Sequence, residues 1–157
     1  MVENPETGAL EPFDFNYLQD NVPELRLLGC DISSVEFSPP LDSSAITTEH
    51  WVQLARVIEE HYEDYDGFVI LHGTDTMAYT ASAMSFVFEG LSKPIVFTGS
   101  QLPVGKLRTD GKENLITAIE IAAARDEAER PRVPEVTLFF ENYLMRGNRT
   151  SKISADQ

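Results

Sequence analysis

Three short apolar segments constrain the fold of this chain more than any other feature of its sequence. They are FVIL at residues 68–71, KPIVFTG at 93–99 and EVTLFF at 135–140. Continuous apolar runs of this kind are typical of strands in a parallel sheet covered on both faces. A segment with helical spacing of apolar residues precedes each one, at residues 47–62, 76–91 and 110–124. The alternation predicts an α/β fold, a parallel sheet with flanking helices and right-handed crossovers.

The N-terminal part of the chain gives weaker patterns. Residues 33–40, SSVEFSPP, predict a short strand that ends at two prolines. Residues 1–24 combine prolines, a glycine and acidic side chains with little periodicity, which predicts a mobile loop at the entrance to a site. The length of 157 residues suits one layered domain with its own core.

Charge and composition narrow the classes of function. The chain has 26 acidic and 12 basic residues and a formal net charge of −14, which repels nucleic-acid phosphates and anionic membranes. We expect neither a nucleic acid nor a membrane as partner, and no signal peptide, because no apolar run is long enough. The single cysteine, Cys30, fits a reducing compartment, so we expect a cytoplasmic protein.

Four polar loops follow the four predicted strands, at residues 42–44, 72–76, 98–101 and 146–152. In open α/β sheets, ligands bind at the carboxyl ends of the strands. Because the carboxyl ends of parallel strands meet at one edge, the sequence predicts that all four loops share a ligand-binding edge.

The loop HGTDT, residues 72–76, carries the strongest candidate chemistry. Gly73 permits a tight strand-to-helix turn, and Thr74, Asp75 and Thr76 then fall at a helix N-terminus. A helix needs only one such residue as a cap, so two polar side chains remain for a ligand. From this stretch alone, capping and function are equally good interpretations. We expect His72 to be a core or supporting histidine and not the base for Thr74.

A threonine hydroxyl becomes a useful nucleophile only when a base removes its proton, and a buried lysine is one such base. Lys152 follows the third apolar strand, so Thr74, Asp75 and Lys152 are the candidate catalytic residues. The plainer interpretation of Lys152 is a solvated loop cation.

Two further loops are candidates for substrate binding. Asp42, Ser43 and Ser44 have the groups to hold a ligand that carries both an ammonium and a carboxylate, or they form an ordinary turn. Ser100 and Gln101 are candidates for hydrogen bonding to an amide, or they simply end a strand. The sequence has no dinucleotide or phosphate-loop motif and no histidine or cysteine pair at zinc spacing, so we expect no cofactor and no metal.

Long stretches of the chain resemble the bacterial type I, cytoplasmic-type L-asparaginases. The resemblance lies in DGFVILHGTDTMAYTASAMSF at residues 66–86, in residues 93–123, in EVTLFFENYLMRGNRTSK at 135–152, and in NPETGALEPF and PPLDSS nearer the N-terminus. It implies the N-terminal domain of a two-domain fold and the hydrolysis of L-asparagine to aspartate and ammonia. It also implies a homo-oligomer, a dimer or tetramer, with allosteric control in some members.

The resemblance also implies roles for individual residues. Thr74 and Lys152 act on the chemistry or activate water, while Asp75 holds the α-ammonium of the substrate. Ser43 and Ser44, with Asp42 beside them, bind the α-carboxylate and ammonium. Ser100 and Gln101 line the pocket for the side-chain amide.

The chain also departs from that family. Its members begin with a strand followed by T-G-G-T, whose first threonine is the usual nucleophile, and this motif does not occur in the sequence. We therefore expect residues 1–157 to be a partial N-terminal domain that lacks the C-terminal domain and is inactive alone. The alternatives are the amidase subunit of a tRNA-dependent amidotransferase and a catalytically incomplete fragment.

Overall fold

The computed structural model of the chain describes residues 2–3, 10–11, 20, 22–35, 46–74, 76–99 and 109–149. Its elements are, in chain order, β1 (Val2–Glu3), β2 (Leu10–Glu11), η1 (Pro23–Leu27), α2 (Thr48–His61), β3 (Phe68–Leu71), α3 (Met77–Val87), β4 (Ile95–Thr98), α4 (Thr109–Ala123), β5 (Val136–Phe140), β6 (Tyr143–Arg146) and η4 (Gly147–Arg149). The three predicted apolar strands and the three predicted helices are confirmed. Of the strand predicted at residues 33–40, residues 33–35 are not in a strand, and the others lie outside the described residues.

The main sheet has the strand order β3-β4-β5-β6. The strands β3, β4 and β5 are parallel, as predicted, and a fourth strand that was not predicted, β6, pairs antiparallel with β5, so the sheet is mixed and mostly parallel. The reversal takes two residues, Glu141 and Asn142, with φ of 50° and 71°. Positive φ at both positions is what the tight turn of a two-residue hairpin requires.

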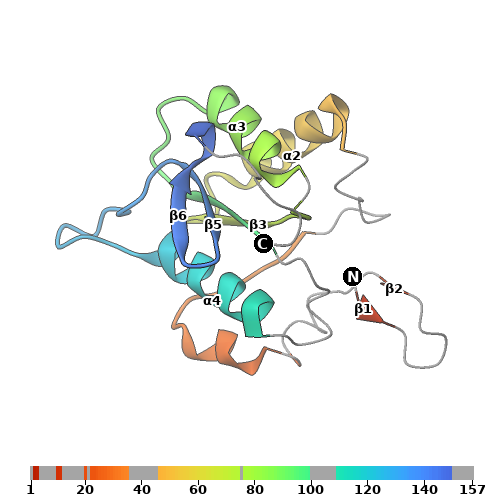
Figure 1. Ribbon diagram of the computed structural model, residues 1–157. Coiled ribbons are helices and arrows are strands. Elements are labelled where there is room, and N and C mark those ends of the chain that lie inside the picture. The colour runs from red at the N-terminus through yellow and green to blue at the C-terminus, as the bar shows by residue number, and fades with distance from the viewer. Residues whose placement is uncertain are drawn as a thin grey trace.

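Helices cover both faces of the sheet, with α2 and α3 on one side and α4 on the other (Figure 1). On the first side, Ile58 of α2 and Met84 of α3 pack against Phe97 of β4. On the second side, Ala118 of α4 packs against Val96 of β4. Alternate residues of β4 therefore face opposite layers, which is why a strand of four buried residues carries no polar face.

The strand β3 is less buried than β4, although its sequence is wholly apolar. Phe68, Val69 and Ile70 are half-buried, and Leu71 is 39% exposed. Among the strands that the structure describes, β3 pairs only with β4 and lies at the end of the sheet. Its position in the sheet, and not its composition, sets this exposure.

The segment around η1 covers the outer side of α4. Val22 and Leu25 are buried against Leu115 and Ile119 of that helix. Nearer the N-terminus, β1 and β2 form a short antiparallel pair. Most of the mobile loop predicted for residues 1–24 lies outside the described residues, so its mobility stays a prediction.

One partly buried hydrogen bond fixes α3 relative to α2. The indole Nε1 of Trp51 donates to Oγ1 of Thr80 at 3.0 Å, and Thr80 is 1% exposed. Because α3 begins at the edge where the candidate site lies, this contact helps to set where the helix N-terminus stands.

Candidate functional site

The carboxyl ends of β3 and β4 lie side by side, as the predicted site requires. Leu71 pairs with Thr98, the last residues of the two strands, so the chain leaves both strands at the same level. The buried hydroxyl of Thr98 donates to the backbone carbonyl of Phe139 in β5 at 2.7 Å. This bond ties the third parallel strand to the same edge.

Thr74 lies in the turn between β3 and α3. The helix starts at Met77, and the residue at its N-cap position is Thr76, whose carbonyl accepts the first helical hydrogen bond from Thr80. Thr74 is half-buried and stands two residues before the cap. The cap position therefore belongs to Thr76, and Thr74 lies close to the end of the helix that favours negative charge.

Thr74 is the one predicted site residue that falls within the described part of the chain. The others lie outside it, namely Asp42, Ser43, Ser44, Asp75, Ser100, Gln101 and Lys152. The contact between Thr74 and Lys152 and the roles of the remaining residues stay predictions. The structure does describe residues next to them in sequence, such as His72 and Gly99, and these show how the carboxyl edge of the sheet is built.

His72 supports the turn that leads to Thr74. Its Nδ1 lies 2.6 Å from the carbonyl oxygen of Gly73, so Nδ1 carries the proton and donates it to this bond. The ring packs edge-on to Phe97, and burial lowers the pKa of His72 below its ordinary value of 6.5. The imidazole is therefore neutral at pH 7, with a buried Nε2 that no described residue contacts through a hydrogen bond. These contacts agree with a supporting role and not with that of a base for Thr74.

Gly99 follows β4 and lies directly against the backbone of His72. A Cβ at this position would lie 2.2 Å from the carbonyl oxygen of His72, a distance that no side chain tolerates. The same two segments are joined by a hydrogen bond from the backbone N–H of His72 to the carbonyl of Thr98, at 3.0 Å. The need for glycine at position 99 thus comes from the close approach of two backbones.

Asn114 is a site-forming residue that sequence reasoning missed. It lies in α4, is 4% exposed, and donates from Nδ2 to the carbonyl oxygen of Gly99 at 2.9 Å. The pattern that points to it is a carboxamide within the apolar face of a helix, immediately before Leu115. A buried polar side chain in that setting needs a partner, and here the partner is the end of β4.

The polar loop at residues 146–152 leaves the sheet at the edge opposite to the one predicted. Arg146 pairs with Thr137 near the start of β5, because β6 has carried the chain back across the sheet. Gly147 then packs against Ala81 of α3 and Val136 of β5, and η4 lies against α3. The prediction that this loop directly follows a parallel strand at the shared edge is wrong, since an intervening strand was not anticipated.

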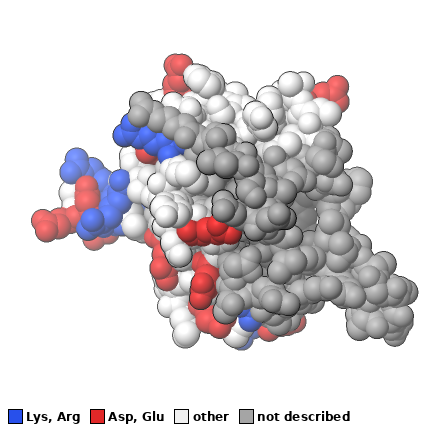
Figure 2. Space-filling model, in the orientation of Figure 1, with Lys and Arg blue, Asp and Glu red and all other residues white. Residues whose placement is uncertain are grey.

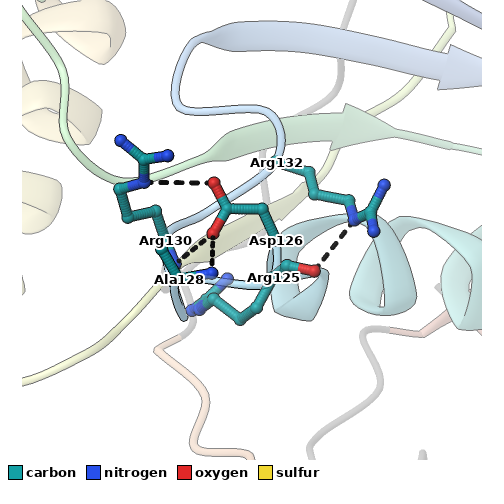
Figure 3. A network of polar contacts seen from close by, with 5 residues as sticks. All are labelled: Arg125, Asp126, Ala128, Arg130 and Arg132. Carbon is teal, nitrogen blue, oxygen red and sulfur yellow. Dashed lines mark hydrogen bonds and ion pairs between the residues drawn. The ribbon is translucent and has the colours of Figure 1, made fainter.

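On the face shown in Figure 2, basic side chains gather, together with acidic ones, on the loop after α4 that projects from the body of the molecule. Its arginines make internal contacts (Figure 3). Arg130 donates to Asp126, Arg125 donates to the carbonyls of Ala122 and Ala124 at the end of α4, and Arg132 donates to the carbonyl of Arg125. Hydrogen bonds from the backbone and side chain of Arg130 lower the pKa of Asp126. We interpret this network as a structural turn that ends the helix.

Neither a metal site nor a membrane span is present in the part of the chain that the structure describes. No group of three or more histidine, cysteine, aspartate or glutamate side chains among those residues is arranged to hold a metal ion. No described helix is long and apolar enough to cross a membrane.

The fold and its edge define an α/β domain in which Thr74 lies at the junction of a strand and a helix. Comparison with known proteins identifies the family: residues 1–157 match the N-terminal domain of asparaginase, and the chain belongs to the asparaginase family of hydrolases. L-asparaginase 1 of Escherichia coli K12 is 55% identical over 126 residues, which are 80% of this chain and 36% of that protein. The 60 kDa lysophospholipase of Mus musculus is 46% identical over 144 residues, 92% of this chain and 24% of that protein.

Solved structures agree with this family. The thermostable L-asparaginase from Thermococcus kodakarensis superimposes with a TM-score of 0.83 at 34% identity, and the match covers 97% of this chain and 44% of that one. Components of the glutamyl-tRNA(Gln) amidotransferases of Thermoplasma acidophilum and Methanopyrus kandleri are also among the relatives. The chain spans only about a quarter to a third of the length of the two curated relatives described above, at 24% and 36%.

Proposed function

We propose that this chain supplies the Thr74–Asp75–Lys152 side of an L-asparagine amidohydrolase site of the type I kind, which hydrolyses L-asparagine to L-aspartate and ammonia. The observation that carries the proposal is the position of Thr74, in the turn between β3 and the N-terminus of α3, in a chain that is 55% identical to an L-asparaginase. The carboxyl edge of an α/β sheet is where such a ligand binds.

Each proposed role follows from the chemistry of the residue. The amine of Lys152 removes the proton of the Thr74 hydroxyl, and the Thr74 oxygen attacks the side-chain amide carbon. The C–N bond then breaks, ammonia leaves with the proton returned from Lys152, and water hydrolyses the resulting ester to aspartate; in the other version, Thr74 and Lys152 activate a water that attacks the amide carbon directly. The carboxylate of Asp75 pairs with the α-ammonium of the substrate. Asp42, Ser43 and Ser44 bind the α-carboxylate and ammonium, and Ser100 and Gln101 hydrogen-bond the amide that is cleaved.

The length of the chain between η4 and Lys152 supports the proposed contact with Thr74. Gly147 packs against Ala81; the chain rises about 4 Å from there to the end of η4 at Arg149, and the three residues on to Lys152 span at most about 11 Å. The helix from Ala81 back to Met77 rises only about 6 Å, and Thr74 follows three residues beyond Met77. The chain beyond Gly147 is therefore long enough for Lys152 to reach the turn at Thr74.

Two alternatives have specific support. Amidotransferase components are among the relatives, and an amidase of that kind would release ammonia to a partner enzyme. The net charge of −14 disfavours an assembly on tRNA. A catalytically incomplete fragment is the second alternative, because the chain spans a minor part of its relatives and has no T-G-G-T motif.

The decisive test measures ammonia release from L-asparagine by the intact natural polypeptide and its variants. Thr74→Val and Lys152→Met should each lower kcat by at least about 100-fold, because each removes a group that moves a proton or attacks. Thr117→Val, in the middle of α4, and Lys93→Met, before the amino end of β4, are matched controls away from the carboxyl edge and should leave kcat nearly unchanged. Near-normal turnover in both site variants would reject the assigned roles.

The same experiment separates the alternatives. An amidotransferase component would show turnover only when its partner and a charged tRNA are supplied, whereas an asparaginase needs neither. Equilibrium sedimentation of the same polypeptide would test the expected dimer or tetramer.

A further inference from the structure

We propose that Asn114 is a positioning residue that sets the selectivity of the site for its amide substrate. This inference rests on the proposed function. Asn114 makes no contact with the reacting groups in our assignment. It acts through the peptide bond that joins Gly99 to Ser100. Ser100 and Gln101 are the two residues proposed to bind the amide.

A buried hydrogen bond connects Asn114 to the end of β4. The Nδ2 group of Asn114 donates to the carbonyl oxygen of Gly99 at 2.9 Å, and the asparagine is 4% exposed. A peptide unit is planar, so a contact that holds the carbonyl of Gly99 also fixes the direction of the N–H and Cα of Ser100. Asn114 therefore sets the direction in which the chain enters the proposed amide pocket.

Gly99 is also confined on its other side. The site of its absent Cβ lies 2.2 Å from the carbonyl oxygen of His72 and 3.5 Å from the sulfur of Met77. Gly99 is thus held between α4 and the junction of β3 with α3, the junction that also carries Thr74. Movement of the Gly99 carbonyl is opposed by backbone on one side and by Asn114 on the other.

An asparagine suits position 114 because it supplies a donor at the right reach. A carbonyl in this buried setting needs a donor, and an apolar side chain at position 114 would leave it unsatisfied. The carboxamide of asparagine is short enough to reach the end of β4 from the body of the helix. Its removal should loosen the peptide unit at residues 99–100 without changing the turn at Thr74, which His72 holds separately through the Gly73 carbonyl.

The expected consequence is a change in selectivity. Asparagine and glutamine differ by one methylene, a difference that a pocket of fixed shape separates by roughly 10–200-fold. Loosening the start of the amide-binding segment should therefore bring the kcat/KM values for asparagine and glutamine closer together. A general loss of stability would instead lower both values in proportion to the folded fraction.

The test compares Asn114→Leu with Leu115→Ala in the intact natural polypeptide. Leu115 is the adjacent residue on α4, is 3% exposed, and packs on the η1 segment instead of Gly99, so its truncation is a control for destabilisation. We expect the ratio of kcat/KM for asparagine to that for glutamine to move toward unity by about fivefold or more in Asn114→Leu, and to stay within about twofold in Leu115→Ala. An unchanged ratio in Asn114→Leu would overturn the inference and leave the proposed function intact.

A second readout does not depend on activity. The NMR shifts of the Gly99 carbonyl carbon and the Ser100 amide nitrogen should change in Asn114→Leu and also in Asn114→Asp, which keeps the side-chain shape but replaces the donor with an acceptor. They should stay in place in Leu115→Ala. If the unmodified protein hydrolyses neither substrate, the proposed function fails. Shifts that stay in place in both Asn114 variants would independently refute the positioning role.

Discussion

Replacement of Gly99 by alanine should destabilise the fold far more than an ordinary glycine substitution. The new Cβ would lie 2.2 Å from the carbonyl oxygen of His72, whereas ordinary contact begins near 3.4 Å. The obstructing atom belongs to the backbone, so no side-chain rotation can relieve the overlap. One of the two strand ends must therefore move by about 1.2 Å, the difference between these distances.

The cost can be estimated from the contacts that such a shift disturbs. Overpacking of a well-packed site costs about 1–3 kcal/mol. The displacement also strains two hydrogen bonds, from His72 N–H to the Thr98 carbonyl and from Asn114 to the Gly99 carbonyl, each contributing about 1 kcal/mol. The expected loss in the free energy of unfolding is therefore roughly 3–5 kcal/mol.

Urea unfolding of Gly99→Ala measures this loss, with Gly90→Ala as the matched control. Gly90 has a φ of +65° and open space where a Cβ would stand, so its substitution reports backbone strain without a clash, about 1–2 kcal/mol. The urea midpoint of Gly99→Ala should fall by about 2 M if the m value is near 2 kcal/mol/M. A loss no larger than that of Gly90→Ala would refute the argument that two backbones meet at Gly99.

Two further predictions concern charged and titrating groups. Burial lowers the pKa of His72 below 6.5, so as the pH falls the unfolded chain binds a proton at this residue before the folded chain does. The free energy of unfolding should therefore decrease as the pH drops below 6.5, by up to about 1.4 kcal/mol per pH unit. His72→Gln should flatten the dependence of the urea midpoint on pH between about pH 7 and pH 5, and equal slopes would contradict the assignment. Asp126→Ala should speed amide hydrogen exchange severalfold at Ala128 and Arg130, whose N–H groups donate to Asp126, while Glu127→Ala should leave both rates unchanged.

The parallel part of the sheet could be predicted because its strands are apolar on both faces. A strand such as IVFT at residues 95–98 has no polar side to place in water, and only a position between two helical layers suits it. The strand β6 could not be predicted in the same way. Its residues are mostly exposed, and the turn before it, Glu141–Asn142, has none of the glycine that usually marks a two-residue hairpin.

The position of Thr74 could be predicted because it depends on local sequence, a strand followed by glycine and then a helix cap. The support given by Asn114 could not, because Asn114 and Gly99 are 15 residues apart and meet only once α4 has packed across the sheet. Periodicity identifies the buried face of a helix. It does not give the rotation and height at which the helix packs, and these decide which carbonyl a buried asparagine meets.

The unexpected strand β6 changes how Lys152 must reach the proposed site. A direct exit from β5 would have placed the polar loop at the carboxyl edge, but the chain instead returns to the opposite edge at Arg146. Under the proposed function, the residues after Gly147 must span the distance back to Thr74 from the place where Gly147 meets Ala81 and Val136. A Cβ at Gly147 would lie 2.8 Å from the carbonyl oxygen of Ala81, so this starting point is also confined by backbone, as Gly99 is by His72. Two glycines, Gly99 and Gly147, therefore each lie against the backbone of another segment, and a larger residue at either position would separate the elements that meet there.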